Sequence, residues 1–182
     1  MMTDPVRERN DTLALLDAAV IPLRQSLNIR LIPPEGASFG YAMRGARDKS
    51  SVAAVKGGIQ DENGAPRPFG PSEFATDDPV VRAILTVMKF EPAVRSAAIL
   101  RFLPRALSVL EDDMFLECAS YQGGPKRPGI STMDWGIAFC CKEDIPDVIF
   151  EKTPDPDQSR FIFLGEDPSD VANNIIICSG RI

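Results

Sequence analysis

Helical and strand patterns alternate along most of this 182-residue chain, and this alternation is the strongest constraint on its fold. An acidic residue followed by proline, a typical helix start, occurs at Asp4-Pro5, Asp78-Pro79 and Asp167-Pro168. Short apolar runs such as 97–103 and 147–151 are typical of strands. The pattern predicts an α/β layered domain in which helices cover a sheet.

The remaining segments extend this reading. Further strands are expected at 38–43, 114–121 and 159–165, and a helix is expected from Pro104. Glu91-Pro92 predicts a short helical piece, and 131–144 begins with a capping-box pattern. The segment after Pro168 predicts a final helix, with a strand as the alternative because of its isoleucine run. Residues 55–82 form a polar, Gly- and Pro-rich loop of a length that is usually functional or disordered.

Composition narrows the possible functions. A hydrophobic fraction of 44% is enough for a real core and predicts a single domain over 1–182, with a helix in 1–27 packed on it. The net charge of −6 argues against nucleic acid as a partner. No apolar run is long enough to span a membrane, and no signal peptide is recognised, so a cytoplasmic location is expected.

The chain contains no histidine, which removes the usual general base and the usual zinc ligand. The four cysteines lack metal-site spacing and are expected to be buried and inert. The acidic run 111–113 predicts a solvated helix end, and the glycine-rich loop with Lys126 and Arg127 predicts a surface loop. The sequence therefore predicts no metal site and no cofactor.

Six phrases of the sequence follow one another in a characteristic order. They are LIPPEGASFGYAM, VAAVKGGI, VVRAILTVMKFEPAVRSAAILRF, STMDWG, PDVIFE and FLGEDPSDV, and they extend from about Leu31 to about Ile177. Together they resemble the archaeal-type ThiN domain of thiamine-phosphate synthases. The resemblance implies a three-layer α/β/α sandwich with a mixed β-sheet, similar to class II aldolases, and a homodimer. It also implies a pocket for thiamine phosphate and its precursors, since active members join a pyrimidine diphosphate to a thiazole phosphate and release pyrophosphate.

The chain departs from this family where the reaction is expected to occur. Active members typically have Gly-Arg-Ile where this chain has Gly57-Gly58-Ile59, and a histidine where it has Pro79. That arginine and histidine are usually credited with catalysis. The family's glycine-rich stretch after DVI is replaced by EKTPDPDQS, whose aspartates would repel phosphate. The resemblance thus implies a retained scaffold with a lost or changed reaction.

Five side chains are candidates for ligand binding. Arg82 and Arg101 match family arginines and could hold a phosphate, or else form ordinary surface ion pairs. Trp135 could stack on a planar ring and Asp134 could accept from an amine; the alternatives are a core tryptophan and a helix-start acid. Ser38 could bind phosphate or be an ordinary turn serine.

Three functions follow, in this order. The first is a ThiN-like domain that binds a phosphorylated small molecule, thiamine phosphate or a precursor, without synthase activity. The second is an active thiamine-phosphate synthase with a rearranged site, because diphosphate displacement can rest on positioning and electrostatic stabilisation. The third is a structural or assembly role with a closed pocket. The residues favour a non-enzymatic role and designate no catalytic residue.

Overall fold

A seven-stranded mixed sheet forms the centre of the chain in the computed structural model, which describes residues 4–122 and 132–182. The strand order is β5-β2-β1-β6-β9-β8-β7, and β3 and β4 form a separate hairpin. β7 and β8 are parallel, whereas the other pairs of the large sheet are antiparallel. The strands are β1 Ser38–Ala42, β2 Val52–Val55, β3 Ile59–Glu62, β4 Ala65–Pro68, β5 Ser72–Phe74, β6 Ser96–Arg101, β7 Cys118–Gln122, β8 Val148–Lys152 and β9 Arg160–Gly165.

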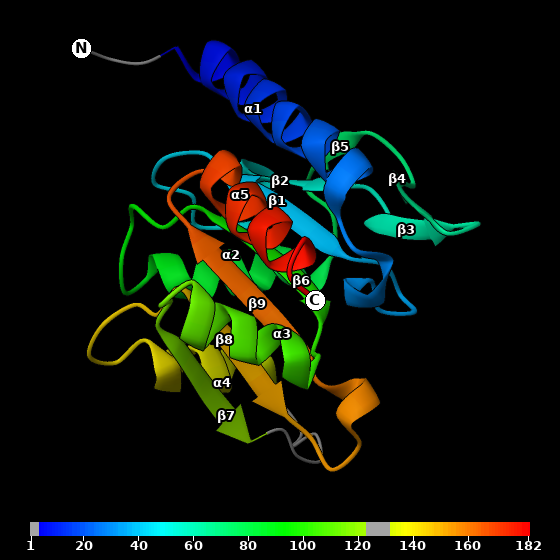
Figure 1. Cartoon of the computed structure of the whole chain (residues 1–182). Coiled ribbons are helices and arrows are strands. Elements are labelled where there is room, and N and C mark those ends of the chain that lie inside the picture. Colours follow the sequence, from blue (N-terminus) through cyan, green and yellow to red (C-terminus); the bar gives the residue numbers. More distant parts are fainter. Residues whose placement is uncertain (1–3, 123–131) are drawn as a thin grey trace.

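Helices cover both faces of this sheet. α1, α3 and α5 lie over one face, and α2 and α4 lie over the other (Figure 1). None of the described helices has both the length and the apolar character needed to cross a bilayer. The α-helices are α1 Pro5–Ser26, α2 Pro79–Met88, α3 Pro104–Ser108, α4 Thr132–Cys140 and α5 Pro168–Ser179; α3 continues as a π-helical turn over Val109–Asp113, and short 3-10 turns cover Ile29–Leu31, Lys49–Ser51 and Pro156–Gln158.

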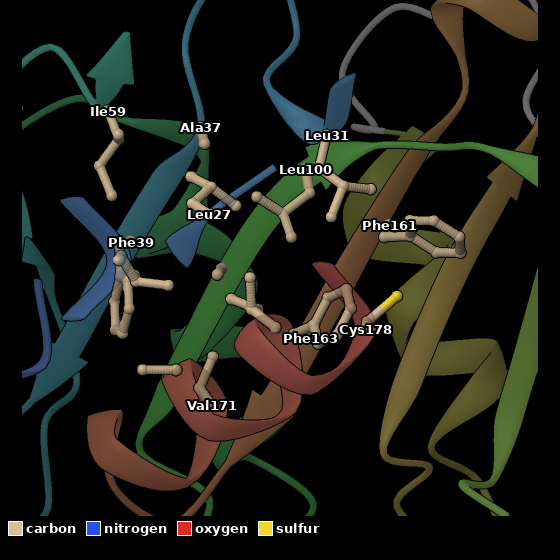
Figure 2. Close-up of a cluster of buried hydrophobic side chains, with 14 of the residues drawn as sticks. Leu27, Leu31, Ala37, Phe39, Ile59, Leu100, Phe161, Phe163, Val171 and Cys178 are labelled. Atoms are coloured by element: carbon tan, nitrogen blue, oxygen red, sulfur yellow. The ribbon is translucent and has the colours of Figure 1, made fainter. Parts of the chain in front are cut away.

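The sheet separates two hydrophobic clusters because successive strand residues point to opposite faces. On β6, Leu100 joins the cluster under α1 and α5, together with Phe161 and Phe163 (Figure 2). Its neighbour Ile99 joins the cluster under α2 and α4, which includes Ile162. Burying one such side chain contributes about 1.5–3 kcal/mol. The predicted α/β fold with a mixed sheet is therefore confirmed.

The predicted helix starts form for a local reason. Asp4, Asp78 and Asp167 accept hydrogen bonds from the backbone N–H groups of Val6, Val80 and Asp170 at 3.0, 2.9 and 3.0 Å. Each carboxylate satisfies a donor that the first helical turn leaves free, and the following proline has no N–H to satisfy. The segment after Pro168 is a helix, so its strand alternative is wrong.

The segment 55–82 is not the long loop that its composition suggests. It contains β3, β4, β5 and the start of α2. Asn63 and Gly64, with φ of 53° and 86°, connect β3 to β4 in the left-handed conformations that favour a tight hairpin. Because β3 and β4 carry few apolar residues, their sequences lack the alternation of apolar and polar residues that predicts a strand.

Two shorter predictions also fail. Glu91-Pro92 forms a turn, in which the Val94 N–H donates to the Glu91 carbonyl oxygen at 3.1 Å, instead of a helix. The strand predicted from Met114 begins only at Cys118, because the preceding π-helical turn closes with a bond from the Met114 N–H to the Val109 carbonyl oxygen.

Candidate functional site

Four polar residues form a row across one end of the sheet. Arg101 pairs with Arg160 across β6 and β9, and Tyr121 pairs with Glu151 across β7 and β8. The β8–β9 register, continued by one residue from Phe150 and Phe161, puts Glu151 opposite Arg160. With a strand spacing of about 4.8 Å, these four residues form a row about 15 Å long, here called the polar row.

The polar row faces the layer formed by α2 and α4. Arg101, Glu151 and Arg160 each lie two residues from an isoleucine of the cluster under those helices, and Tyr121 belongs to that cluster. Since strand side chains alternate with a period of two, all four point to this face. Residues from four strands thereby meet on one surface at the rim of the core.

An ion pair covers the Arg160 position of the row. Its Nε and Nη2 atoms donate to the two carboxylate oxygens of Glu35 at 2.7 and 3.0 Å. Its Nη1 atom donates to the carbonyl oxygens of Asp157 and Ser159 at 2.8 and 2.9 Å. The Glu35 carbonyl oxygen in turn accepts from Gln60. Arg160 is thus firmly oriented, with only 14% of its side chain exposed.

Arg101 is the contrasting member of the row. Its Nε atom is buried and has no hydrogen-bond partner among the residues that the structure describes. Its cross-strand neighbour Arg160 carries the same charge. A buried donor left without a partner costs about 1–3 kcal/mol, and like charges directly opposite are destabilising. A bound anion would relieve both costs.

The other end of the row combines a phenol with a carboxyl group. Burial raises the pKa of Tyr121, and the nearby Glu151 charge raises it further, so the hydroxyl stays protonated. Its Oη atom is buried and finds no hydrogen-bond partner within 4–122 and 132–182. Burial also raises the pKa of Glu151, although the charge of Arg160 opposes this effect. This end can therefore donate from a hydroxyl and accept at a carboxylate.

The structure brings two predicted residues, Arg82 and Asp134, into direct contact. Arg82 of α2 donates from Nη2 to Oδ2 of Asp134 on α4 at 2.7 Å, and this pair joins the two helices. The Asp134 side chain is 30% exposed, so the pair lies at the edge of the helix layer. The charge of Asp134 also acts on Tyr121, raising its pKa slightly, which links the pair to the polar row.

Trp135 is not a core residue, contrary to one of the two alternatives. It is 53% exposed and stacks on Phe139, with ring centroids 5.5 Å apart. The buried residues of α4, such as Ile137, lie on the opposite side of the helix. The indole therefore faces outward from α4, whereas Asp134 faces α2.

Ser38 lies close to the polar row on the same face. It is the first residue of β1, is 9% exposed and pairs with Ile99, two residues before Arg101. Such a diagonal neighbour lies about 7–8 Å away, within reach of a long side chain. Ser38 and Arg101 are thus close to each other on this face.

The two positions expected to hold the catalytic arginine and histidine have backbone roles. Gly58 has a φ of +70°, and a Cβ atom there would lie 2.8 Å from the Ala37 carbonyl oxygen. Pro79 is the first residue of α2, directly after its Asp78 cap. Neither position offers a functional side chain.

Other candidate features contribute nothing to this site. Among the described residues no group of three or more potential metal ligands converges. The loop with Lys126 and Arg127 and the start of the capping-box motif at Ser131 lie outside the described residues. Two surface hollows, of about 380 Å³ between α1 and α5 and about 280 Å³ between α1 and β4, lie away from the polar row.

Comparison with known proteins identifies the family to which this fold belongs. The family described as thiamine-phosphate synthase ThiN matches residues 15–177, and the chain belongs to this family. A curated relative is the bifunctional thiamine biosynthesis protein ThiDN of Methanocaldococcus jannaschii, 25% identical over 158 residues. That match covers 85% of this chain but only 37% of the relative. Family membership supports a thiamine-related function.

Two solved structures share the fold. The C-terminal domain of a phosphomethylpyrimidine kinase superposes with a TM-score of 0.85 at 27% identity, over 94% of this chain and 100% of that chain. The C-terminal domain of protein MJ0236 superposes with a TM-score of 0.85 at 23% identity, over 95% and 96% of the two chains. The layered arrangement is therefore common to this chain and both domains.

The polar row includes residues that sequence reasoning missed. Tyr121, Glu151 and Arg160 lie at or near strand ends, and Glu35 lies in the turn before β1. The sequence contains part of the signal. Alternation along 147–151 puts Glu151 on the same side of its strand as Ile149, and alternation along 159–165 puts Arg160 on the same side as Ile162. Which strands are neighbours, and in what register, is non-local information that the pattern does not contain.

Proposed function

We propose that this domain binds a phosphorylated small molecule related to thiamine phosphate at the polar row, without synthase activity. The observation that carries the proposal is the guanidinium group of Arg101, whose buried Nε has no partner among the described residues and lies beside a second arginine. A phosphate would accept charge-assisted hydrogen bonds there. The Ser38 hydroxyl on the same face could add one more bond.

The order of groups along the row fits a ligand with a phosphate at one end and hydrogen-bonding groups at the other. Arg101 and Arg160 form a basic end, while Glu151 and the Tyr121 hydroxyl form the other end. Thiamine phosphate has a phosphate at one end, a cationic thiazolium ring next to it, and an aminopyrimidine with hydrogen-bonding groups at the other end. Electrostatic complementarity along the row therefore favours one orientation of such a ligand.

The backbone at the two replaced positions supports a non-enzymatic role. A side chain at Gly58 would need a left-handed backbone, which costs about 1–2 kcal/mol, and would collide with the Ala37 carbonyl oxygen. Pro79 starts α2 and contributes no titratable group. The local structure is thus built around the residues present, and the pair credited with catalysis in the family has no substitute at either position.

A second candidate is an active synthase with a rearranged site. The observation in its favour is the Tyr121–Glu151 pair, which combines a protonated hydroxyl with a carboxyl of raised pKa and could exchange a proton with a ligand. Loss of pyrophosphate depends largely on electrostatic stabilisation, and the two arginines could contribute to it.

One set of titrations separates these functions. The purified chain is titrated with thiamine phosphate and with each of its two precursors in a calorimeter, and the precursor mixture is analysed for thiamine phosphate by chromatography. Binding of thiamine phosphate or a precursor without product is the expected result. Formation of product at a rate proportional to protein concentration establishes the synthase instead. No heat change with any of the three compounds rejects both and leaves the structural or assembly role.

A further inference from the structure

Glu35 occupies the basic end of the polar row as an anion would. Its carboxylate makes two parallel hydrogen bonds with Arg160, of 2.7 and 3.0 Å, which is the geometry in which arginine also binds phosphate. Partial burial alone would raise the pKa of Glu35, but the hydrogen bond from Arg160 and the charges of Arg160 and Arg101 lower it overall. Glu35 therefore interacts electrostatically with both arginines.

The two partners of this ion pair differ in how easily they can move. The Glu35 side chain is 58% exposed, so its carboxylate can rotate into water. Arg160 is 14% exposed and keeps two bonds to the carbonyl oxygens of Asp157 and Ser159 without Glu35. The Glu35 backbone also stays in place, because its carbonyl oxygen accepts from Gln60 at 3.2 Å. Loss of the pair would leave Arg160 pre-oriented.

The charges favour an exchange of anions. In the described residues Glu35 is the only carboxylate hydrogen-bonded to Arg160, and Arg101 has no ion-pair partner. Glu151 also faces Arg160, but the described residues show no ion pair between the two side chains. A phosphate monoester carries a charge of about −1.5 to −2 near neutral pH and offers three acceptor oxygens. It can therefore serve both guanidinium groups, whereas one carboxylate serves only Arg160.

We propose that Glu35 is an intramolecular competitor for the anion site, and that a phosphate group displaces its carboxylate and binds Arg160 and Arg101 together. This deepens the proposed function and rests on it for the identity of the ligand, but not for the anion chemistry. With the Glu35 carboxylate bound, the site would discriminate against singly charged anions. Such an anion would replace one single negative charge by another and would gain little binding free energy.

The test compares Glu35→Gln with Glu62→Gln, titrated with inorganic phosphate and with thiamine phosphate. Glu62 is an exposed residue of the β3–β4 hairpin, so its substitution removes the same charge away from the row. We expect Glu35→Gln to bind both compounds at least fivefold more tightly than the unchanged protein, and Glu62→Gln to stay within twofold. Equal or weaker binding by Glu35→Gln overturns the proposal, because Glu35 would then support the site or play no part in it.

A second variant and a folding control keep the result interpretable. Glu35→Asp keeps the charge but shortens the side chain by one methylene, so it weakens the pair with Arg160 and should also raise phosphate affinity. Circular dichroism of each variant establishes that it is folded before titration. If Glu35→Asp and Glu35→Gln both leave phosphate affinity unchanged, competition by Glu35 is excluded.

The two compounds distinguish failure of this inference from failure of the proposed function. If Glu35→Gln tightens phosphate binding while thiamine phosphate binds no better than phosphate, Glu35 is a competitor and the thiamine-related ligand is wrong. If thiamine phosphate binds the unchanged protein tightly and Glu35→Gln has no effect, the proposed function stands and the role of Glu35 is wrong.

Discussion

At the scale of single residues, Arg101 shows that a side chain can derive its role from its cross-strand neighbour. Its sequence context, the end of an apolar strand, resembles that of many surface arginines. Arg160, its partner across the β6–β9 register, has the same charge and is paired with Glu35, whereas the Nε atom of Arg101 has no hydrogen-bond partner among the described residues.

Arg101→Gln should separate binding from folding. Loss of charge-assisted bonds, each contributing about 1.5–3 kcal/mol, should weaken binding of a phosphorylated ligand about 10- to 100-fold. The midpoint of urea unfolding should stay unchanged or rise, because a like-charge pair is removed. The matched control is Arg105→Gln on α3, an exposed arginine over the other face of the sheet, which should leave binding unchanged. Equal effects of the two substitutions on binding would contradict a specific role for Arg101.

Gly58 and Gly45 allow backbone strain to be separated from a steric clash. Both have positive φ, +70° and +69°, but a Cβ atom would lie 2.8 Å from the Ala37 carbonyl oxygen at Gly58 and meet nothing within 4 Å at Gly45. Gly45→Ala should lose about 1–2 kcal/mol from the left-handed conformation alone. Gly58→Ala should lose at least 1 kcal/mol more, measured by chemical denaturation. Equal losses would show that the turn at Gly58 relaxes freely.

At the scale of elements, the position of α4 depends on one glycine. A Cβ atom at Gly136 would lie 2.2 Å from the ring of Tyr121, so α4 approaches β7 more closely than any other residue would permit. The same helix carries Asp134, whose bond to Arg82 joins α4 to α2. The close approach therefore sets the distance between the helix layer and the polar row.

Gly136→Ala tests whether packing outweighs helix propensity. Alanine is about 1 kcal/mol more favourable than glycine inside a helix, which alone predicts stabilisation. The contact with Tyr121 predicts overpacking, which costs about 1–3 kcal/mol. We expect a net loss in the free energy of unfolding, together with a change in near-ultraviolet circular dichroism from the displaced tyrosine. A stabilised variant with an unchanged spectrum would show that α4 can move away without cost.

At the scale of the whole molecule, two hydrophobic clusters protect the cysteines. Burial raises the pKa of Cys118 to about 12, that of Cys141 to about 11 and that of Cys178 to about 11; burial also raises the pKa of Cys140. The thiolate is the reactive form of cysteine. Cys141 and Cys178 are buried as expected from the sequence, whereas Cys118 and Cys140 are only partly buried.

Thiol labelling should therefore report global unfolding. At pH 8 a thiol with a pKa of 11 is about 0.1% ionised, against about a quarter for an ordinary cysteine. Labelling with a chromogenic disulfide should be slow in buffer and rapid for all four thiols in denaturant. Rapid labelling of two or more cysteines in buffer would contradict this protection and would indicate local opening near α4 or α5.

Local sequence signals predicted much of the fold, and their limits are physical. The three acid-proline starts, the helical spacing and the central strands depend on interactions within a few residues, so they could be read directly. The hairpin at Ile59–Pro68 was missed because its strands pair with each other and carry little apolar alternation. The turn at Glu91 was misread because proline fits both a first helical turn and a β-turn.

The candidate site was likewise only partly predictable from the sequence. Ser38, Arg82, Arg101, Asp134 and Trp135 were singled out by residue type and by resemblance, and the structure joins Arg82 to Asp134 while turning Trp135 outward. Glu35 could not be found, because its partner Arg160 is 125 residues away in the sequence. Charge pairs at that separation are created by the sheet register, which no local pattern encodes.

The sequence by itself determined the α/β class, the positions of most elements, the family resemblance and the absence of histidine chemistry. These properties follow from composition and from contacts between near neighbours in the chain. Only the tertiary structure decided that Arg101, Arg160, Glu151 and Tyr121 form one row and that Glu35 covers part of it. The reason is that strand order and register depend on the packing of the whole core, in which each strand's neighbours come from distant segments.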